Sequence, residues 1–155
     1  MGVTSIQWTD HSWNPIRAND SRNGATGHYC EKVSPGCTNC YASAMQRRFR
    51  MPEFDGRQLN VDSPIVPYLD EKTLMGPLKR KKPTKYFVCD MTDLFGRWVP
   101  DVWIDSVFAV AAMCPQHTFQ VLTKRHERMF LYMRDAGLRQ HEWTRRAMKL
   151  GSPTW

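Results

Sequence analysis

The chain has 155 residues, of which 41% are hydrophobic and 24% charged, a balance that excludes a disordered protein and a membrane protein. This length predicts one domain, residues 1–155, and is too short for a complete eight-unit β/α barrel, which needs roughly 200 residues or more. The net charge is +7, and residues 121–155 hold eight basic and three acidic residues. This basic C-terminal third is either a nucleic-acid contact or a solvated helical face.

The N-terminal part predicts a strand, a loop and a turn. Residues 6–16 mix β-branched and aromatic side chains and read as a short strand that stops at Pro15. Residues 17–29 are polar and glycine-rich, so we expect a loop that leads to Cys30. Ser34–Cys37 has the sequence of a turn, because proline fixes one φ and glycine permits a positive φ.

A helix is predicted to begin near Thr38 or Asn39, since both are good N-cap residues. Tyr41, Met45 and Phe49 recur at helical spacing and predict its apolar face.

The next stretch, residues 51–85, contains five prolines and predicts an irregular connection, with a short helix near residues 70–75. Tyr86–Cys89 is a continuous apolar run, as expected of a strand that is buried on both faces. Pro100 marks the start of a helix that must end by Pro115.

The last third predicts a strand and two further helices. Phe119–Thr123 is the strand, and residues 125–136 form the first helix, with Gly137 as its C-cap. A more polar helix is expected over residues 139–149.

The predicted order is strand and helix, three times over, which implies parallel strands joined by right-handed crossovers. Three such units leave a buried type of strand at a sheet edge, where it invites pairing. We therefore expect an incomplete, partial β/α (TIM-like) barrel. A missing C-terminal half or a second chain would complete it, and the isolated chain would be marginally stable and prone to association.

Three of the five cysteines, Cys30, Cys37 and Cys40, fall within eleven positions. An odd cysteine count and the absence of an apparent export signal favour a reduced, cytoplasmic protein with a metal site over a disulfide framework. Three thiolates without a fourth cysteine ligand are typical of a [4Fe–4S] cluster with one open iron. We expect Cys89 and Cys114 to be structural.

Two alternatives compete with the cluster. His28 could complete a Cys3His zinc site with the same three cysteines. The three residues could also be unliganded, reduced thiols.

Four blocks of the sequence resemble the phage-associated three-cysteine-motif family, phage proteins catalogued under gp thirty-seven/sixty-eight that are radical-SAM-like and of unknown function. The resemblance covers residues 5–133. It rests on Ile6–Asp10 with Trp13–Pro15, Cys30 with Val33–Ala42, Phe87–Phe95, and Pro115–Arg125 with Glu127–Met129.

The resemblance implies a partial β/α barrel of the radical-SAM type, a [4Fe–4S] cluster on Cys30, Cys37 and Cys40, and S-adenosylmethionine (SAM) on the open iron. The spacing departs from the usual radical-SAM pattern, because six residues rather than three separate the first two cysteines. In the radical-SAM pattern an aromatic residue that lines the adenine of SAM usually precedes the third cysteine. Here Asn39 stands there, and Tyr41, on the other side of Cys40, is the candidate cofactor contact.

Polar residues at two predicted strand ends are candidates to bind the cofactor. Radical-SAM barrels hold the methionine amine and carboxylate of SAM where Asp90, Thr92 and Asp93 stand, although Asp93 could instead cap a turn. Thr123 and Lys124 end the next strand and could meet a carboxylate or a phosphate, although Lys124 could be a surface residue.

We therefore expect an iron–sulfur, radical-SAM-like protein that cleaves SAM to act on an unknown substrate, with no catalytic residue assigned. The alternatives are a non-catalytic zinc module that binds nucleic acid, and an inactive fragment.

Overall fold

The main sheet contains three parallel strands and one short antiparallel strand. The computed structural model describes residues 2–4, 6–48, 59–60 and 62–151. Strands β2 (His11–Trp13), β6 (Lys85–Val88) and β7 (Thr118–Val121) run parallel in that order, and β1 (Gly2–Val3) pairs antiparallel with β2. The three parallel strands and their order agree with the predicted β/α arrangement. The described part forms an open sheet, with β7 at its edge, and not a closed barrel.

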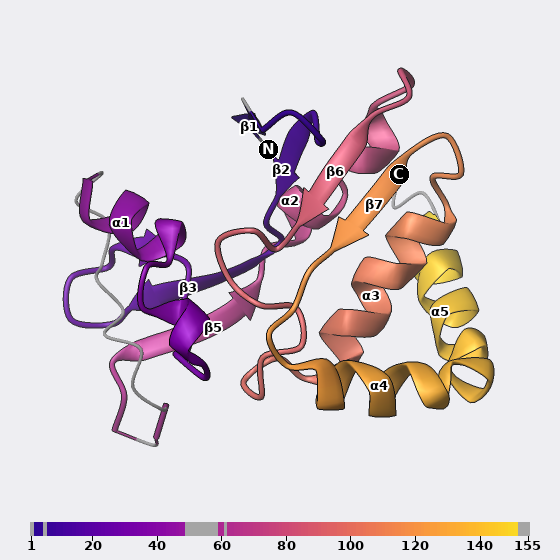
Figure 1. Cartoon of the computed structure of the whole chain (residues 1–155). Helices are drawn as coiled ribbons and strands as arrows, with labels where there is room; N and C mark the ends of the chain where they lie inside the picture. Colours follow the sequence, from indigo (N-terminus) through magenta and orange to yellow (C-terminus); the bar gives the residue numbers. More distant parts are fainter. Residues whose placement is uncertain (1, 5, 49–58, 61, 152–155) are drawn as a thin grey trace.

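One face of this sheet packs on helices and forms the core (Figure 1). His11, Tyr86 and Phe119 lie side by side on neighbouring strands, and Trp13 aligns with Val88 in the same way. Helix α3 (Asp101–Ala112) contributes to the same core as the strand side chains Trp13, Tyr86 and Val88. The core residues from both layers include Trp13, Tyr86, Val88, Ile104, Val107 and Val110. The prediction that Tyr86–Cys89 forms a strand buried on both faces is confirmed for residues 86–88.

Two helices follow β7, and their boundary differs from the prediction. Helix α4 (His126–Arg134) ends at Asp135, whose carbonyl accepts hydrogen bonds from Leu138 and Arg139 and so begins α5 (Ala136–Gly151) at once. Gly137 therefore lies inside α5, and its predicted role as a C-cap is wrong. The described part contains no helix that is long and apolar enough to span a membrane.

A second sheet, which the sequence did not predict, is inserted between β2 and β6. Its strands are β4 (Thr26–Gly27), β3 (Ile16–Asp20) and β5 (Ile65–Leu69), in that order and all antiparallel. The expected loop over residues 17–29 is thus wrong in part, because two strands lie within it. Pro67 is tolerated because β5 is an edge strand.

Helix α1 (Tyr41–Arg48) begins slightly later than predicted and turns a different face inward. Tyr41 and Met45 are exposed, whereas Ala42 and Gln46 are buried. The predicted apolar face is therefore wrong for these residues, and Phe49 lies outside the described residues. The 3-10 turn η1 (Pro35–Cys37) confirms the predicted turn.

The connection that returns to the main sheet contains a short helix, α2 (Glu71–Leu74), as predicted. The Asp70 side chain caps it by accepting a hydrogen bond from the Thr73 backbone N–H. A 3-10 turn, η2 (Pro77–Lys79), follows and leads through a basic run to β6.

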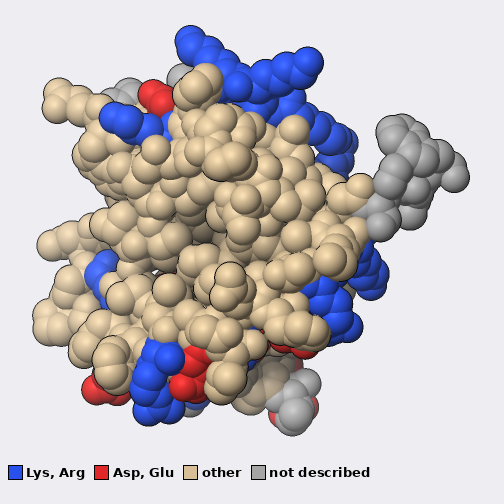
Figure 2. All heavy atoms as spheres, turned by 90° about the vertical axis from the view of Figure 1, so that its right-hand side faces the viewer, with Lys and Arg blue, Asp and Glu red and all other residues tan. Residues whose placement is uncertain are grey.

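Several arginines of the basic C-terminal third form ion pairs within the chain. The pairs are Arg125 with Asp93, Arg128 with Asp101, Arg134 with Asp135, Arg139 with Asp105, and Arg145 with Glu142. Figure 2 shows the side that carries α3 and α5, where basic side chains gather at the top and along the edges and leave a central area without charge. Arg125 and Arg139 thus serve the fold, because they pair with the buried carboxylates of Asp93 and Asp105.

Candidate functional site

The predicted site residues line a single cavity of about 420 Å³. This set combines the three cysteines with the residues at the strand ends, and it comprises Cys30, Cys37, Cys40, Tyr41, Asp90, Thr92, Asp93, Thr123 and Lys124. The volume lies in the usual range for small-molecule sites, about 300–1,000 Å³. The structure therefore brings all nine predicted residues together.

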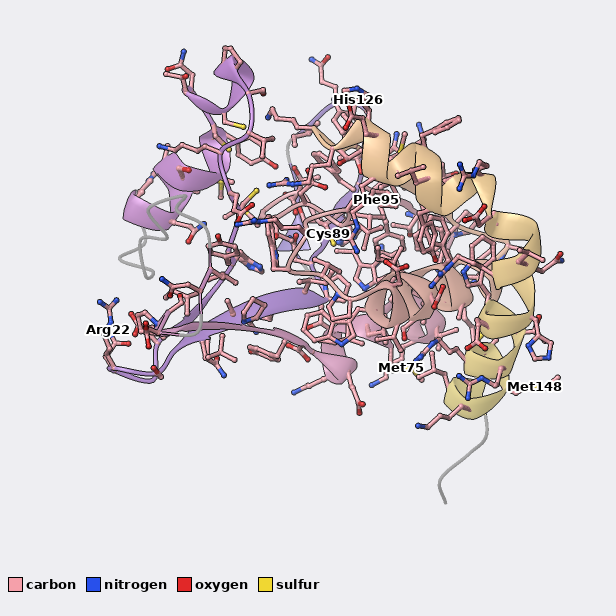
Figure 3. The ribbon with its side chains drawn as sticks, turned by 90° about the horizontal axis from the view of Figure 1, so that it is seen from below. Arg22, Met75, Cys89, Phe95, His126 and Met148 are labelled. Atoms are coloured by element: carbon pink, nitrogen blue, oxygen red, sulfur yellow. The ribbon has the colours of Figure 1, made fainter. Side chains whose placement is uncertain are left out.

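The cavity lies where the carboxyl ends of β6 and β7 meet the loop and helix that carry the cysteines. Cys89 follows β6 and adopts φ 56°, a left-handed conformation that non-glycine residues rarely take. Figure 3 shows Cys89 near the centre of the molecule, between the part that carries α1 and the helices α3 to α5. Its turn directs the chain from the strand into the wall formed by residues 90–93.

The three cysteines differ in their surroundings. Burial raises the pKa of Cys30 to about 11, although the nearby Arg125 guanidinium opposes this shift. Burial also opposes ionisation of Cys37, but hydrogen bonds from the backbone at Val33 and Ser34 outweigh it and lower the pKa of that thiol. All three are free thiols, as are Cys89 and Cys114.

The three cysteines line one cavity without forming a site for a single metal ion within the described residues. Within the described residues, no three His, Cys, Asp or Glu side chains are close enough to hold one ion. A [4Fe–4S] cluster instead distributes its cysteine ligands over different irons, so the thiolates must face a common space rather than one point. Cys30, Cys37 and Cys40 do face a common cavity.

The residue expected to complete a zinc site has another contact. His28 is buried, and its Nδ1 lies 3.2 Å from the carbonyl oxygen of Ile16. Burial lowers the pKa of His28, which keeps the ring neutral. The cavity lining does not include this residue, so the geometry does not favour the Cys3His arrangement.

Asp90 is held by side chains from β2 and α1. Its carboxylate accepts hydrogen bonds from Ser12 Oγ at 2.8 Å and from the Asn14 amide, and the Tyr41 hydroxyl donates to the Asp90 carbonyl at 2.8 Å. Tyr41 thus joins the first turn of α1 to the end of β6. This contact places Tyr41 beside Asp90, in agreement with their predicted proximity in one site.

Asp93 joins the ends of β6 and β7. Its Oδ1 accepts from the Thr123 hydroxyl at 2.7 Å and from the Phe95 N–H at 2.9 Å, and its Oδ2 accepts from the Lys124 N–H at 3.1 Å and from Arg125 Nη1 at 2.9 Å. The Asp93 side chain is 6% exposed. Because its carboxylate already accepts four hydrogen bonds, Asp93 is better suited to position the ends of β6 and β7 than to bind a ligand.

Arg125 connects the strand ends to the cysteine loop. It pairs with Asp93, donates to the Glu31 carbonyl at 3.1 Å, and stacks over the Trp98 ring at 4.6 Å. The Glu31 carboxylate in turn accepts from Arg97 at 2.7 Å. The residue next to Cys30 is therefore fixed to the end of β7.

Two of the predicted residues, Thr92 and Lys124, differ in whether their side chains are already bonded within the protein. The Thr92 hydroxyl donates to the Tyr29 carbonyl, so it is engaged inside the wall. Lys124 is exposed at the rim, and its aliphatic stem passes near Gly36, where an added Cβ would lie 3.5 Å from Cε. Lys124 is thus the candidate that can reach an incoming anion.

The sequence predictions missed Glu31 and Gln46, both buried residues that line the cavity. Its position next to Cys30 was the only sequence feature that could have indicated Glu31 as a site residue. Gln46 follows Ala42 by four residues, and that helical spacing could have identified the inward face of α1.

Comparison with known proteins places the chain in a family. No curated protein and no solved structure matches it. One family model matches residues 3–151, which is nearly the whole chain. The chain therefore belongs to the family described as protein of unknown function (DUF5131).

Proposed function

We propose that this protein is an iron–sulfur, radical-SAM-like protein that carries a [4Fe–4S] cluster on Cys30, Cys37 and Cys40. The observation that carries the proposal is the shared cavity, which the three cysteines line together with the polar ends of two parallel strands. β/α folds place their chemistry at this end of the sheet. The sequence resemblance to the phage-associated family supports the same assignment.

The cavity residues have distinct roles in this proposal. When bound, the cluster supplies the electron for reductive cleavage of SAM, the reaction that starts hydrogen abstraction from a substrate. Lys124 is available for the SAM carboxylate at the cavity rim. Asp93 and Arg125 hold the wall rigid through their ion pair, and Asp90 orients Tyr41. Phe87 and Leu122 give the cavity an apolar wall that limits access of water.

We also propose that the parallel sheet is part of a radical-SAM barrel whose next strand pairs with β7, supplied by a second chain or by a longer polypeptide. Two observations support this. β7 is a sheet edge, and Leu122 at its carboxyl end is 55% exposed. Light scattering after size-exclusion chromatography should show self-association of the 155-residue chain. A stable monomer that cleaves SAM would contradict this part.

The test of the cluster is anaerobic reconstitution followed by measurement of iron and acid-labile sulfide. Cys30→Ala, Cys37→Ala and Cys40→Ala should each lose the cluster, because the remaining two thiolates cannot hold it. Cys114→Ala is the matched control, since Cys114 is buried away from the cavity. This variant should keep wild-type iron and sulfide. The reduced wild-type protein should also convert SAM to 5′-deoxyadenosine when dithionite supplies the electron.

Two results would contradict the proposal. Full iron and sulfide in any one of the three cavity variants would remove that cysteine from the ligand set. Stoichiometric zinc without sulfide, lost in His28→Ala, would instead identify the zinc module.

A further inference from the structure

Gln46 is a buried polar residue of the cavity wall, and its amide oxygen has no hydrogen-bond partner among the residues that the structure describes. It lies on α1, is 5% exposed, and lines the cavity. Within the described residues, its Oε1 atom accepts no hydrogen bond. A buried amide oxygen without a donor is unfavourable, so native proteins usually satisfy such groups.

The other polar groups of the cavity make Gln46 stand out. The carboxylates of Glu31, Asp90 and Asp93 all accept hydrogen bonds from other parts of the chain. These three acids therefore need no ligand to complete their bonding. The amide of Gln46 can turn about its last side-chain bond, which exchanges its oxygen and nitrogen. The oxygen is buried in the structure, and such a turn would move it to the place of the amide nitrogen.

The cavity that Gln46 lines can accept a flat ring with an amino group. Phe87 and Leu122 contribute an apolar wall to the same cavity. An amide side chain matches adenine well, because its oxygen accepts from the adenine amino group and its nitrogen donates to a ring nitrogen. A hydrogen-bonding site of this kind rejects analogues that lack the matching group.

We propose that Gln46 recognises adenine in this cavity, its amide oxygen accepting a hydrogen bond from the adenine amino group. The inference rests on the proposed function, which places an adenosine compound here. The adenine could come from SAM or from an adenine nucleotide, and the two sources share this chemistry.

The test compares binding and stability in Gln46→Met, which keeps the length of the side chain and removes its polar atoms. The probes are S-adenosylhomocysteine, its deaminated counterpart S-inosylhomocysteine, and AMP, measured by calorimetry on the full chain before and after cluster reconstitution. The wild type should prefer S-adenosylhomocysteine to the deaminated compound by about tenfold. Gln46→Met should lose that preference.

Thermal unfolding without ligand separates recognition from a structural role. Gln46→Met should melt at or above the wild-type temperature, because the variant removes an unsatisfied buried acceptor. Gln116→Met is the matched control, since Gln116 is exposed and outside the cavity lining. It should keep the wild-type preference.

The outcomes distinguish this inference from the proposed function. Unchanged preference in Gln46→Met, a lower melting temperature without ligand, or no binding of any probe would overturn the role of Gln46. Gln46-dependent binding of AMP but not of S-adenosylhomocysteine, in a protein that assembles no cluster on reconstitution, would support adenine recognition and contradict the radical-SAM assignment. A reconstituted cluster together with probe binding that does not depend on Gln46 would support the proposed function and overturn the role of Gln46.

Discussion

Replacement of Asp93 by Asn tests whether this carboxylate holds the cavity wall together. Asn keeps the shape and one acceptor oxygen, but it turns the other oxygen into an amino group. If that group replaces Oδ2, it faces two donors, the Lys124 N–H and Arg125 Nη1. The change also removes the negative charge beside Arg125, which is only 11% exposed.

The expected loss of stability follows from these contacts. Removing one partner of a buried ion pair costs about 3–5 kcal/mol when the other charge stays buried. Arg125 keeps its bond to the Glu31 carbonyl and its stacking on Trp98, so we expect the lower end, about 3 kcal/mol. A domain is stable by only about 5–15 kcal/mol, so this loss is large.

Urea unfolding followed by tryptophan fluorescence measures this loss, and the m-value should stay unchanged because the exposed surface does not change. Asp135→Asn is the matched control, since the Asp135–Arg134 pair is exposed and its loss should have almost no effect. A loss below about 1 kcal/mol for Asp93→Asn would refute the argument, because it would show that water or another group replaces the carboxylate.

Three further substitutions test other parts of the structure. The Cys89→Gly variant should be more stable than Cys89→Ala by about 1 kcal/mol in urea unfolding, because only glycine adopts φ 56° without strain. Equal stability of the two variants would contradict this. Asp105→Ala should lower the free energy of unfolding by about 3–5 kcal/mol, since this buried carboxylate accepts hydrogen bonds from Tyr132, Arg139 and Trp143. Calorimetric unfolding would show the loss, and a near-neutral effect would refute the argument. Burial would raise the pKa of Asp70, but its bonds to Thr73 and Arg17 outweigh this and place it below 3.8. Its contribution is therefore present above about pH 4 and lost as the pH falls through the folded-state pKa, so Asp70→Asn should destabilise the protein at neutral pH and less at about pH 3.

The parallel sheet could be predicted because its signals are local. The central strand is a continuous apolar run, and prolines bound the helix that follows it. The common location of the cysteines and strand ends also followed from sequence, because carboxyl ends of parallel strands meet at one edge.

The second sheet could not be predicted for a physical reason. β3 is short and places the charged Asp20 at a buried position, and its partner β5 lies more than forty residues away and contains Pro67. The roles of Glu31 and Gln46 could not be predicted either. Glu31 is bonded to residues that lie far away in the sequence, and the missing hydrogen bond of Gln46 is visible only in the folded chain.

The inserted sheet has a consequence for the order of folding. His11 pairs with Tyr86, while Tyr86 pairs with Phe119, so β2 closes a much longer loop than β7 does. Loop closure becomes more costly with length, and distant contacts slow folding. We expect β6, α3 and β7 to form the folding nucleus and β2 to dock late. Substitutions at Val107 should then slow refolding, whereas those at Trp13 should mainly speed unfolding, and the reverse pattern would contradict this order.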